Sequence, residues 1–290
     1  MTSVVIAAHN EEHVIGACLD ALLGQLGPEA IEIVVSANGC TDRTAAVATR
    51  SGVTVIDRAE PGKTAALDAA DLVATGFPRI YLDADIVVPP GGIAAITARF
   101  DASPRPLAVV PRRRLDTAGR PWPVRAYFSI NQRMAPFRHG LFGRGMIAVS
   151  EAGRARFDVF PGVIADDLFL DSQFSDAEKA EASEVEVVVE APFTTSDLLR
   201  RLVRVRRGNR QLRASAEAGL VVAQVRPVDR WAWLRDAVVP EPRLVFAAVP
   251  YLIITVTAAV LARRPAKAGR EWGRDESTRG RRPEPEGGGT

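Results

Sequence analysis

Residue types that mark several common protein classes are scarce in this chain. Its 290 residues include only two cysteines, Cys18 and Cys40, and three histidines. Two cysteines cannot build a disulfide framework and indicate a reducing compartment, and so few histidines leave little material for a structural zinc site. The formal net charge is only +2, which argues against nucleic acid as a partner held by bulk charge. Apolar residues are plentiful at 47% of the total, enough for a sizeable buried core.

Two phosphate-binding motifs and a signal peptide are also missing. No GxGxxG follows the first apolar run, which argues against a dinucleotide-binding Rossmann domain. Gly62-Lys63-Thr64 resembles the end of a P-loop, but Asp57 stands where that motif has its first glycine. The N-terminus leads straight into the apolar run 4–8 without a basic region, so we expect no signal peptide and a cytoplasmic domain.

A long apolar run lies near the C-terminus, at residues 244–262. Sixteen of its nineteen residues are apolar and none is charged. A membrane span needs roughly 20 apolar residues, so the run is at the short edge of the range, and Pro250 would kink it. A short span, an interfacial or re-entrant helix and a buried core helix all remain open, and arginines on both sides leave the orientation undecided. Residues 263–290 hold eight Lys or Arg against five Asp or Glu and few apolar residues, which predicts a disordered basic tail.

The body of the chain alternates between short apolar runs and helical spacing. Strands are expected at 4–8, 31–36, 53–56, 80–82 and 107–110, and helices at 11–26, 42–50, 63–74 and 93–100. Asn10 is the expected N-cap of the first helix. This order predicts an α/β fold with a mostly parallel sheet covered by helices on both faces, which binds ligands beyond the carboxyl ends of its strands.

Acidic side chains follow the strand expected at 80–82. Asp83 and Asp85 are two residues apart, so in an extended stretch they point to one side. Two close carboxylates repel each other unless a cation lies between them, and oxygen ligands suit Mg²⁺ or Mn²⁺ together with phosphate oxygens. The pattern therefore favours a metal-bridged diphosphate over a solvated acidic turn.

Six stretches together resemble the family 2 glycosyltransferases of the GT-A fold. They are AAHNEE (7–12), VVSANGCTDRTA (34–45), GKTAALDAA (62–70), YLDADI (81–86), RGMIAVSEAGRARF (144–157) and ADDLFLD (165–171). Each is weak alone, but their order and spacing follow the family across most of residues 4–175. The resemblance implies a Rossmann-like GT-A fold and transfer of a sugar from a nucleotide-diphosphate sugar to an acceptor hydroxyl, usually with inversion.

The resemblance also implies roles for the donor site. Asn10 and Glu11 stand where the first loop of the family meets the nucleotide, and Asn38 stands where a second aspartate often contacts the base. That departure puts recognition of uracil in question. Lys63 stands where a basic residue approaches the nucleotide or its diphosphate. Asp83 would face the ribose and the metal, and Asp85 would coordinate the metal. Plain structural roles remain open for Asn10 as a helix cap, Asn38 as a turn residue and Lys63 as a solvated helix start.

An acidic pair matches the position of the family's catalytic base. Inverting transfer needs a carboxylate to accept the proton of the attacking hydroxyl. The resemblance assigns that role to Asp167 and a positioning role to Asp166. Adjacent acids also stabilise helix N-termini, and the sequence 168–170 does continue as a helix, so that alternative stays open.

Arginines are concentrated in the expected helix at 196–213. They occupy seven positions: Arg200, Arg201, Arg204, Arg206, Arg207, Arg210 and Arg213. The helix is either an ordinary solvated one or a surface for anionic headgroups near the apolar run. Following the family, Arg207 could also reach the diphosphate. The QxxRW motif of processive synthases is not present at its spacing, so transfer of a single sugar is expected.

Two further segments have expected roles on the acceptor side. The arginines 112–114 are expected in a loop after the fifth strand, where they flank an acceptor or phosphate or are merely solvated. Residues 121–140 are expected to form acceptor loops.

These observations divide the chain into four parts. We expect a catalytic domain at 1–215, a connecting segment at 216–243, a transmembrane or interfacial helix at 244–262 and the basic tail at 263–290. The leading hypothesis is a membrane-associated inverting glycosyltransferase with a cytoplasmic catalytic domain and a lipid-linked or envelope glycan acceptor. A metal-dependent nucleotidyltransferase and a non-catalytic membrane-bound nucleotide-sugar binder remain as alternatives.

Overall fold

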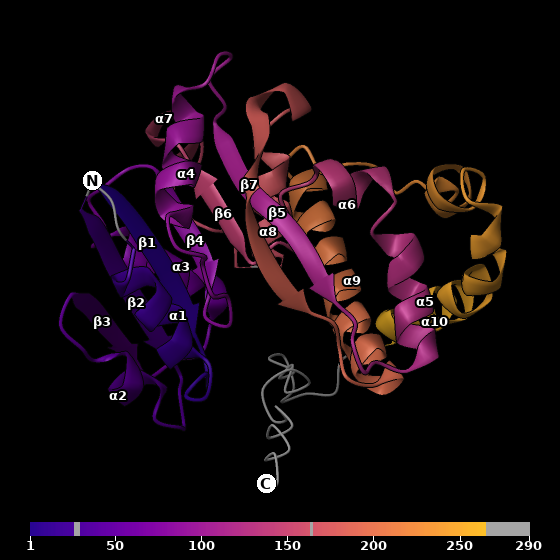
Figure 1. Ribbon diagram of the computed structural model, residues 1–290, viewed down its shortest axis with the longest axis horizontal. Helices are drawn as coiled ribbons and strands as arrows, with labels where there is room; N and C mark the ends of the chain where they lie inside the picture. Colours follow the sequence, from indigo (N-terminus) through magenta and orange to yellow (C-terminus); the bar gives the residue numbers. More distant parts are fainter. Residues whose placement is uncertain (26–29, 163–164, 265–290) are drawn as a thin grey trace, which may run out of the picture.

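The protein is built on one seven-stranded sheet, seen in a computed structural model that describes residues 1–25, 30–162 and 165–264 (Figure 1). The strands are β1 Thr2–Ala8, β2 Ile31–Asn38, β3 Val53–Arg58, β4 Arg79–Asp83, β5 Ala108–Asp116, β6 Met146–Val149 and β7 Lys179–Glu190. Their order across the sheet is β3-β2-β1-β4-β6-β5-β7. The expected basic tail lies outside the described residues from position 265 onward.

Ten α-helices are found in the described part of the chain. They are α1 Ile15–Leu23, α2 Thr44–Ala48, α3 Lys63–Asp71, α4 Gly92–Ala98, α5 Trp122–Asn131, α6 Ala135–His139, α7 Glu151–Arg154, α8 Asp166–Ser172, α9 Thr195–Glu217 and α10 Val245–Arg263. Short helical turns are η1 Arg99–Asp101, η2 Asp176–Glu178, η3 Trp233–Val238 and η4 Pro242–Leu244.

The sheet is mostly parallel, as the sequence predicts. β3, β2, β1 and β4 run parallel, and β5 pairs in parallel with β7 at the other end. β6 lies between the two groups and runs antiparallel to both β4 and β5. The sequence analysis did not anticipate β6, because four apolar residues leave no periodicity to read.

Helices cover both faces of the sheet and create two cores. Val4 and Ile6 of β1 belong to the core under α1, α2 and α4, whereas Val5 belongs to the core under α3 and α8. All three side chains are fully buried, which explains why β1 reads as an uninterrupted apolar run. A third apolar cluster joins α5, α9 and α10 beside this sandwich (Figure 1).

Three local expectations are wrong. The first helix begins at Ile15 and not at 11, so Asn10 is not its N-cap; Asn10 has a positive φ of 56° in the loop after β1. The arginines 112–114 lie within β5 and not after it, because β5 continues alongside β7 past a register shift at Pro111/Arg112. Residues 121–140 are not open loops, since most of them form α5 and α6.

The apolar run near the C-terminus forms α10, which continues through Pro250. One face of α10 packs against α5 and α9. The opposite face is an exposed apolar stripe, which consists of Val245, Phe246, Val249, Leu252, Ile253, Val256 and Val260. The segment 242–263 is long and apolar enough to cross a membrane, but only 28% of its most apolar window is buried. That exposure does not fit a buried core helix.

Candidate active site

A small pocket opens at the carboxyl edge of the parallel strands. Its walls come from the ends of β4 and β6, the first turn of α3 and the first turn of α8. The residues that line it are Lys63, Leu67, Tyr81, Leu82, Asp83, Gly143, Arg144, Gly145, Met146, Ile147, Asp166, Asp167 and Leu170. Segments about one hundred residues apart in the chain therefore contribute polar groups to one place.

Lys63 lies at the centre of the charged groups in this pocket. Its Nζ is 2.9 Å from Asp83 Oδ1 and 2.9 Å from Asp166 Oδ2. Burial opposes the charged form, but Asp166 and Asp83 together raise the pKa of Lys63 above its usual range. Lys63 is therefore a permanent cation that joins the DxD aspartate to the acidic pair, and it is not a solvated helix start.

Asp167 is the carboxylate best suited to take up a proton. Its two oxygens accept backbone hydrogen bonds, Oδ2 from Gly143 N at 3.0 Å and Oδ1 from Leu168 N at 2.8 Å. Burial and the charge of Asp166 raise the pKa of Asp167 to about 6, against the opposing charge of Lys63. A carboxylate with this pKa is deprotonated at neutral pH yet basic enough to accept a proton in a transition state.

The loop before β6 is held in a glycine-dependent conformation. Gly143 and Gly145 have φ of 69° and 70°, in the left-handed region. A Cβ atom on Gly145 would lie 2.5 Å from Ile86 Cγ1, so no side chain fits there. This loop presents Gly143 N to Asp167 and Gly145 O to Asp83 N at 2.8 Å, and it thereby sets the distance between the two carboxylates.

Asp83 is the last residue of β4 and Asp85 follows just after it, and neither side chain is buried. Ala84 and Ile86 between and after them are buried, whereas the Asp83 side chain is 46% exposed and Asp85 is exposed. No cluster of three or more His, Cys, Asp or Glu side chains that could hold a metal ion occurs in the described residues. Two such carboxylates fit Mg²⁺ or Mn²⁺ when phosphate oxygens of a bound nucleotide complete the ligand set. Asp83 and Asp85 are thus the residues that would hold such an ion.

The first two loops are tied to each other at the same edge of the sheet. Asn10 Oδ1 accepts a hydrogen bond from Thr41 N at 2.8 Å, and Glu11 N donates to Thr44 Oγ1 at 2.7 Å. Asn38 is only 1% exposed; its Nδ2 donates to Ala8 O at 2.8 Å and its Oδ1 accepts from Gly62 N at 3.0 Å. The amide of Asn38 therefore holds β1 and the start of α3 together through these two hydrogen bonds.

Arg207 is not brought to this pocket. Its guanidinium donates to Arg264 O at 3.1 Å and lies 3.5 Å from Leu261 O, at the C-terminal end of α10. The sequence analysis placed the neighbouring cation of the site, Arg113, in a loop. Arg113 lies in β5, and its Nη1 donates to Gly143 O at 3.1 Å. Burial, followed by the charges of Arg144 and Arg201, lowers the pKa of Arg113 to about 10.

Residues 3–152 of the chain match the family model described as Glycosyl transferase family 2. The chain belongs to this family. The glycosyltransferase match spans half of the sequence and contains β1 to β6, including Lys63, Asp83 and Asp85. Asp166 and Asp167 lie beyond the matched residues, and they line the same pocket.

Related proteins support the family and the fold. An uncharacterized glycosyltransferase of Mycobacterium tuberculosis and one of Mycobacterium bovis are each 33% identical over 121 residues, 42% of this chain and 52% of theirs. The chain thus spans about half the length of these curated relatives. The mannosyltransferase PcManGT of Pyrobaculum calidifontis, solved with GDP-Man and Mn²⁺, is similar in structure, with a TM-score of 0.58 at 22% sequence identity. The superposition covers 90% of this chain and 73% of the PcManGT chain. S. aureus TarS 1–349 with UDP has a TM-score of 0.51 at 16% sequence identity, and the superposition covers 90% of this chain and 91% of the TarS chain. Both solved structures show the GT-A fold shared with this chain.

Proposed function

We propose that this family 2 protein is an inverting glycosyltransferase that moves one sugar from a nucleotide-diphosphate sugar to an acceptor hydroxyl. The observation that carries the proposal is the convergence of Lys63, Asp83, Asp166 and Asp167 in one pocket at the carboxyl edge of the sheet. GDP-Man bound to the archaeal neighbour and UDP bound to TarS support a nucleotide-sugar donor as the ligand class.

The acceptor is activated by Asp167. As the hydroxyl oxygen attacks the anomeric carbon, its proton passes to the Asp167 carboxylate, and the bond from that carbon to the diphosphate oxygen breaks on the opposite face. The electron pair leaves with the nucleoside diphosphate, so the configuration at the anomeric carbon inverts. Asp166 does not compete for the proton, because its Oδ2 is engaged by Lys63 at 2.9 Å.

The leaving group is stabilised by cations. Lys63 supplies positive charge within the pocket, and Arg113 adds charge next to it through its contact with the lining residue Gly143. Mg²⁺ or Mn²⁺ held by Asp83 and Asp85 would neutralise the departing diphosphate as a Lewis acid. Mn²⁺ in the PcManGT complex is consistent with this choice of ion.

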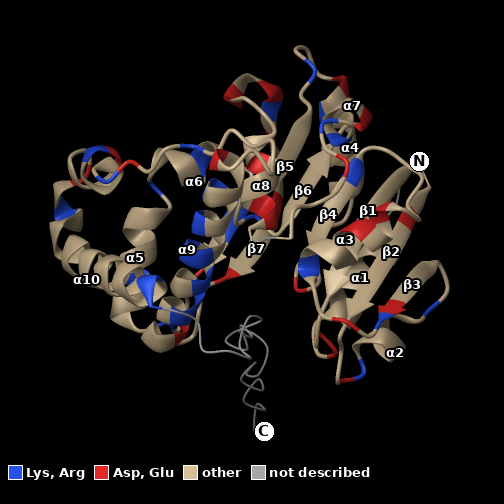
Figure 2. Ribbon diagram, turned by 180° about the vertical axis from the view of Figure 1, so that it is seen from behind, with Lys and Arg blue, Asp and Glu red and all other residues tan. Residues whose placement is uncertain are grey.

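We further propose that the protein works at a membrane surface. The exposed apolar stripe of α10 suits the headgroup and acyl boundary, whereas α9, which packs beside α10, carries too many arginines to enter the hydrocarbon core (Figure 2). An interfacial helix therefore fits better than a span. A lipid-linked or envelope glycan acceptor is in keeping with this placement, with the catalytic domain on the cytoplasmic side.

A screen of donors tests the proposed activity. Thermal unfolding of the purified chain is followed with Mn²⁺ and UDP, GDP or their sugar conjugates, and a ligand at one hundred times its Kd raises the stability by about 2.7 kcal/mol. The matching nucleotide sugar is then assayed for transfer or slow hydrolysis. Absence of a shift with every nucleoside diphosphate would overturn the assignment. A shift without sugar release would leave a non-catalytic binder, and release of pyrophosphate from a nucleoside triphosphate would indicate a nucleotidyltransferase.

A further inference from the structure

A second and larger pocket lies between α9 and α10, apart from the active-site pocket. Its volume is about 430 Å³, far above the ~30 Å³ that one water occupies. It is lined by Arg206, Asn209, Arg210, Arg213, Val228, Ala259 and Arg263. None of these residues belongs to the active-site pocket described above.

The pocket is strongly cationic because one helix face supplies most of it. Four lining residues come from one face of α9, because they follow one another at helical spacing. Counted from Arg206, the others lie three, four and seven residues further on, at Asn209, Arg210 and Arg213. Arg263 completes the wall from the end of α10. Figure 2 shows Lys and Arg positions repeated along the ribbon of α9, close to α10.

The positive charge of the pocket is not balanced within the described chain. No carboxylate of residues 1–25, 30–162 or 165–264 forms an ion pair with Arg206, Arg210, Arg213 or Arg263. Glu217 acts on Arg213 only from beyond ion-pair distance. The Nε of Arg206 is buried and has no hydrogen-bond partner among the described residues. Together with the unbalanced positive charge, this donor suits a ligand with acceptor oxygens.

The negative end of the neighbouring helix is already neutralised. The free carbonyl groups at the C-terminus of α10 would repel an anion. Arg207 donates to Arg264 O at 3.1 Å and approaches Leu261 O. This arginine therefore shields the pocket from the helix dipole. Arg213 donates to Arg226 O at 2.9 Å, whereas Arg210 and Arg263 form no ion pair with a described carboxylate.

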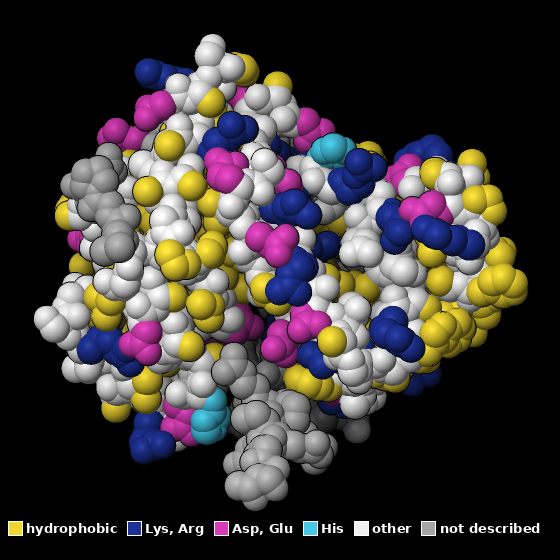
Figure 3. All heavy atoms as spheres, viewed as in Figure 1, with side chains coloured by type: hydrophobic (Ala, Val, Ile, Leu, Met, Phe, Trp, Pro, Cys, Tyr) yellow, Lys and Arg dark blue, Asp and Glu magenta, His cyan; other side chains and the backbone are white. Residues whose placement is uncertain are grey.

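An apolar surface adjoins the pocket. Val256 of the exposed stripe is 57% exposed and lies about one helical turn before the lining residue Ala259. Val260 is 49% exposed and directly follows Ala259. Figure 3 shows hydrophobic side chains at the edge of the molecule where Figure 1 places α10 and the residues before it. A ligand that fits both features has an anionic headgroup and an apolar tail.

We propose that the α9–α10 pocket binds the phosphate group of an anionic membrane lipid, with a preference for a phosphate monoester. Several guanidinium groups can pair in bidentate fashion with the oxygens of such a group. The acyl chains then lie along the stripe of α10. The proposal goes beyond sugar transfer and rests on the membrane association proposed above for α10.

Flotation of the full chain with vesicles tests the proposal. Three vesicle types are used: phosphatidylcholine alone, phosphatidylcholine with phosphatidic acid, and phosphatidylcholine with phosphatidylglycerol at matched surface charge. We expect the strongest binding to phosphatidic acid, which carries the monoester. The variant Arg210→Gln/Arg263→Gln should bind phosphatidic acid vesicles on the order of tenfold more weakly, and Arg210→Lys/Arg263→Lys should retain most of the binding.

The control variant removes the same charge elsewhere. Arg43 and Arg105 are exposed and lie outside the pocket, so Arg43→Gln/Arg105→Gln should float like the wild type. Equal losses in both Gln variants would overturn the pocket in favour of net charge. Unfolding is also measured with inorganic phosphate alone. Protection of the wild type but not of Arg210→Gln/Arg263→Gln, without any difference in flotation, would mean that the site takes free phosphate and would overturn a lipid ligand.

Failure of the membrane proposal gives a different result. Binding to vesicles of phosphatidylcholine alone depends on the apolar stripe and not on the pocket arginines. A chain that floats with no vesicle type contradicts membrane association itself. A chain that floats equally on neutral and acidic vesicles contradicts only the pocket.

Discussion

Three carboxylates share the active-site pocket with one lysine. Asp83, Asp166 and Asp167 would repel one another if all were ionised without a counter-ion. Lys63 contacts the first two and lowers the pKa of the third by its charge. The lysine therefore offsets part of the repulsion among these carboxylates, while burial keeps the pKa of Asp167 raised to about 6.

Replacement of the proposed base tests its role directly. Asp167→Asn should reduce transfer by about 10²–10⁴-fold, because the amide cannot accept the proton. Binding of the nucleoside diphosphate should persist, as Asp167 does not contact the proposed metal ligands. In the wild type, kcat should fall as the pH drops through about 6, where the base becomes protonated. Rapid turnover by the Asn variant would contradict the assignment.

Removal of the lysine charge should move that pH dependence. In Lys63→Met the cation that lowers the pKa of Asp167 is lost, while Asp166 and Asp83 still raise it. The acidic limb of the rate profile should therefore shift to higher pH, and the Lys63→Arg variant should restore much of the original limb. A profile that keeps its shape in Lys63→Met, with only a lower rate, would show that the lysine acts on the donor alone.

The exposed aspartate just after β4 can be tested through the metal. Asp85→Ala should lose the Mn²⁺-dependent part of nucleotide binding, which calorimetry with and without EDTA measures. Glu60 is an exposed acid on a different loop, so Glu60→Ala serves as the control and should bind normally. Full transfer by the wild type in excess EDTA would contradict a metal-dependent donor site.

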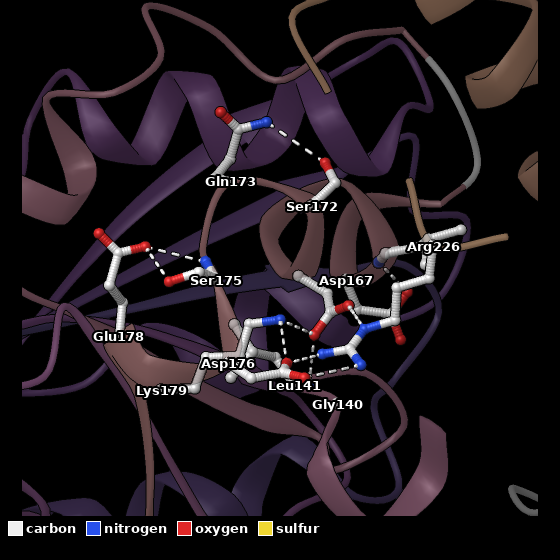
Figure 4. Close-up of polar contacts among 12 residues, drawn as sticks. Gly140, Leu141, Asp167, Ser172, Gln173, Ser175, Asp176, Glu178, Lys179 and Arg226 are labelled. Atoms are coloured by element: carbon white, nitrogen blue, oxygen red, sulfur yellow. Dashed lines mark hydrogen bonds and ion pairs between the residues drawn. The ribbon is translucent and has the colours of Figure 1, made fainter. Parts of the chain in front are cut away.

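At the scale of elements, a buried ion network positions α8, the helix that begins with Asp166 and Asp167. Asp171 is 1% exposed; it accepts hydrogen bonds from Leu141 N at 2.9 Å, Lys179 Nζ at 2.7 Å and Arg226 Nε at 3.2 Å. Figure 4 shows Lys179 from the start of β7 and Arg226 from the segment after α9 reaching the region beside Leu141. Arg226 belongs to the segment 216–243, for which the sequence predicts only a connecting role, and its contact with Asp171 helps to hold α8 in position.

Loss of the central acid of this network should destabilise the protein. Asp171→Ala leaves the buried Lys179 with only the longer contact to Asp176 at 3.8 Å, and loss of a buried ion-pair partner costs about 3–5 kcal/mol. Asp176, which also pairs with Arg226, is 64% exposed, so Asp176→Ala should cost at most about 1 kcal/mol. Urea unfolding compares the two variants. Equal midpoints would show that the buried network adds no stability.

At the scale of the whole molecule, one side of the protein is built differently from the rest. The sheet and its helices enclose two cores, whereas α10 buries one face and leaves the other apolar and exposed. An exposed apolar surface of this kind marks an interaction site. Figure 1 places α5, α9 and α10 together beyond the β7 end of the sheet.

Polar substitutions on the stripe test whether it meets a membrane. Phe246 and Ile253 are 76% and 62% exposed, so Phe246→Ser/Ile253→Ser should fold normally. Binding to phosphatidylcholine vesicles should weaken, because each buried apolar side chain contributes about 1.5–3 kcal/mol. Leu72 and Val87 are 89% and 52% exposed on other elements, and Leu72→Ser/Val87→Ser is the matched control. Equal binding by all three proteins would exclude the stripe as the membrane contact.

Local sequence determined much of this protein. The uninterrupted apolar run of β1 and the 3.6-residue spacing of apolar side chains in α3 depend only on neighbouring residues. The ordered motifs were enough to predict the family, the sheet edge that carries the site, and Lys63, Asp83 and Asp166 as its members.

Only the tertiary structure decided the contacts between distant segments. Asn38 turns its amide to the backbone, Arg207 lies against the end of α10, and Arg113 approaches Gly143 from within β5. Strand β6 reverses direction between β4 and β5, and α10 exposes one face and not the other. Each of these depends on which residues from elsewhere in the chain are adjacent in space, and local periodicity carries no information about that.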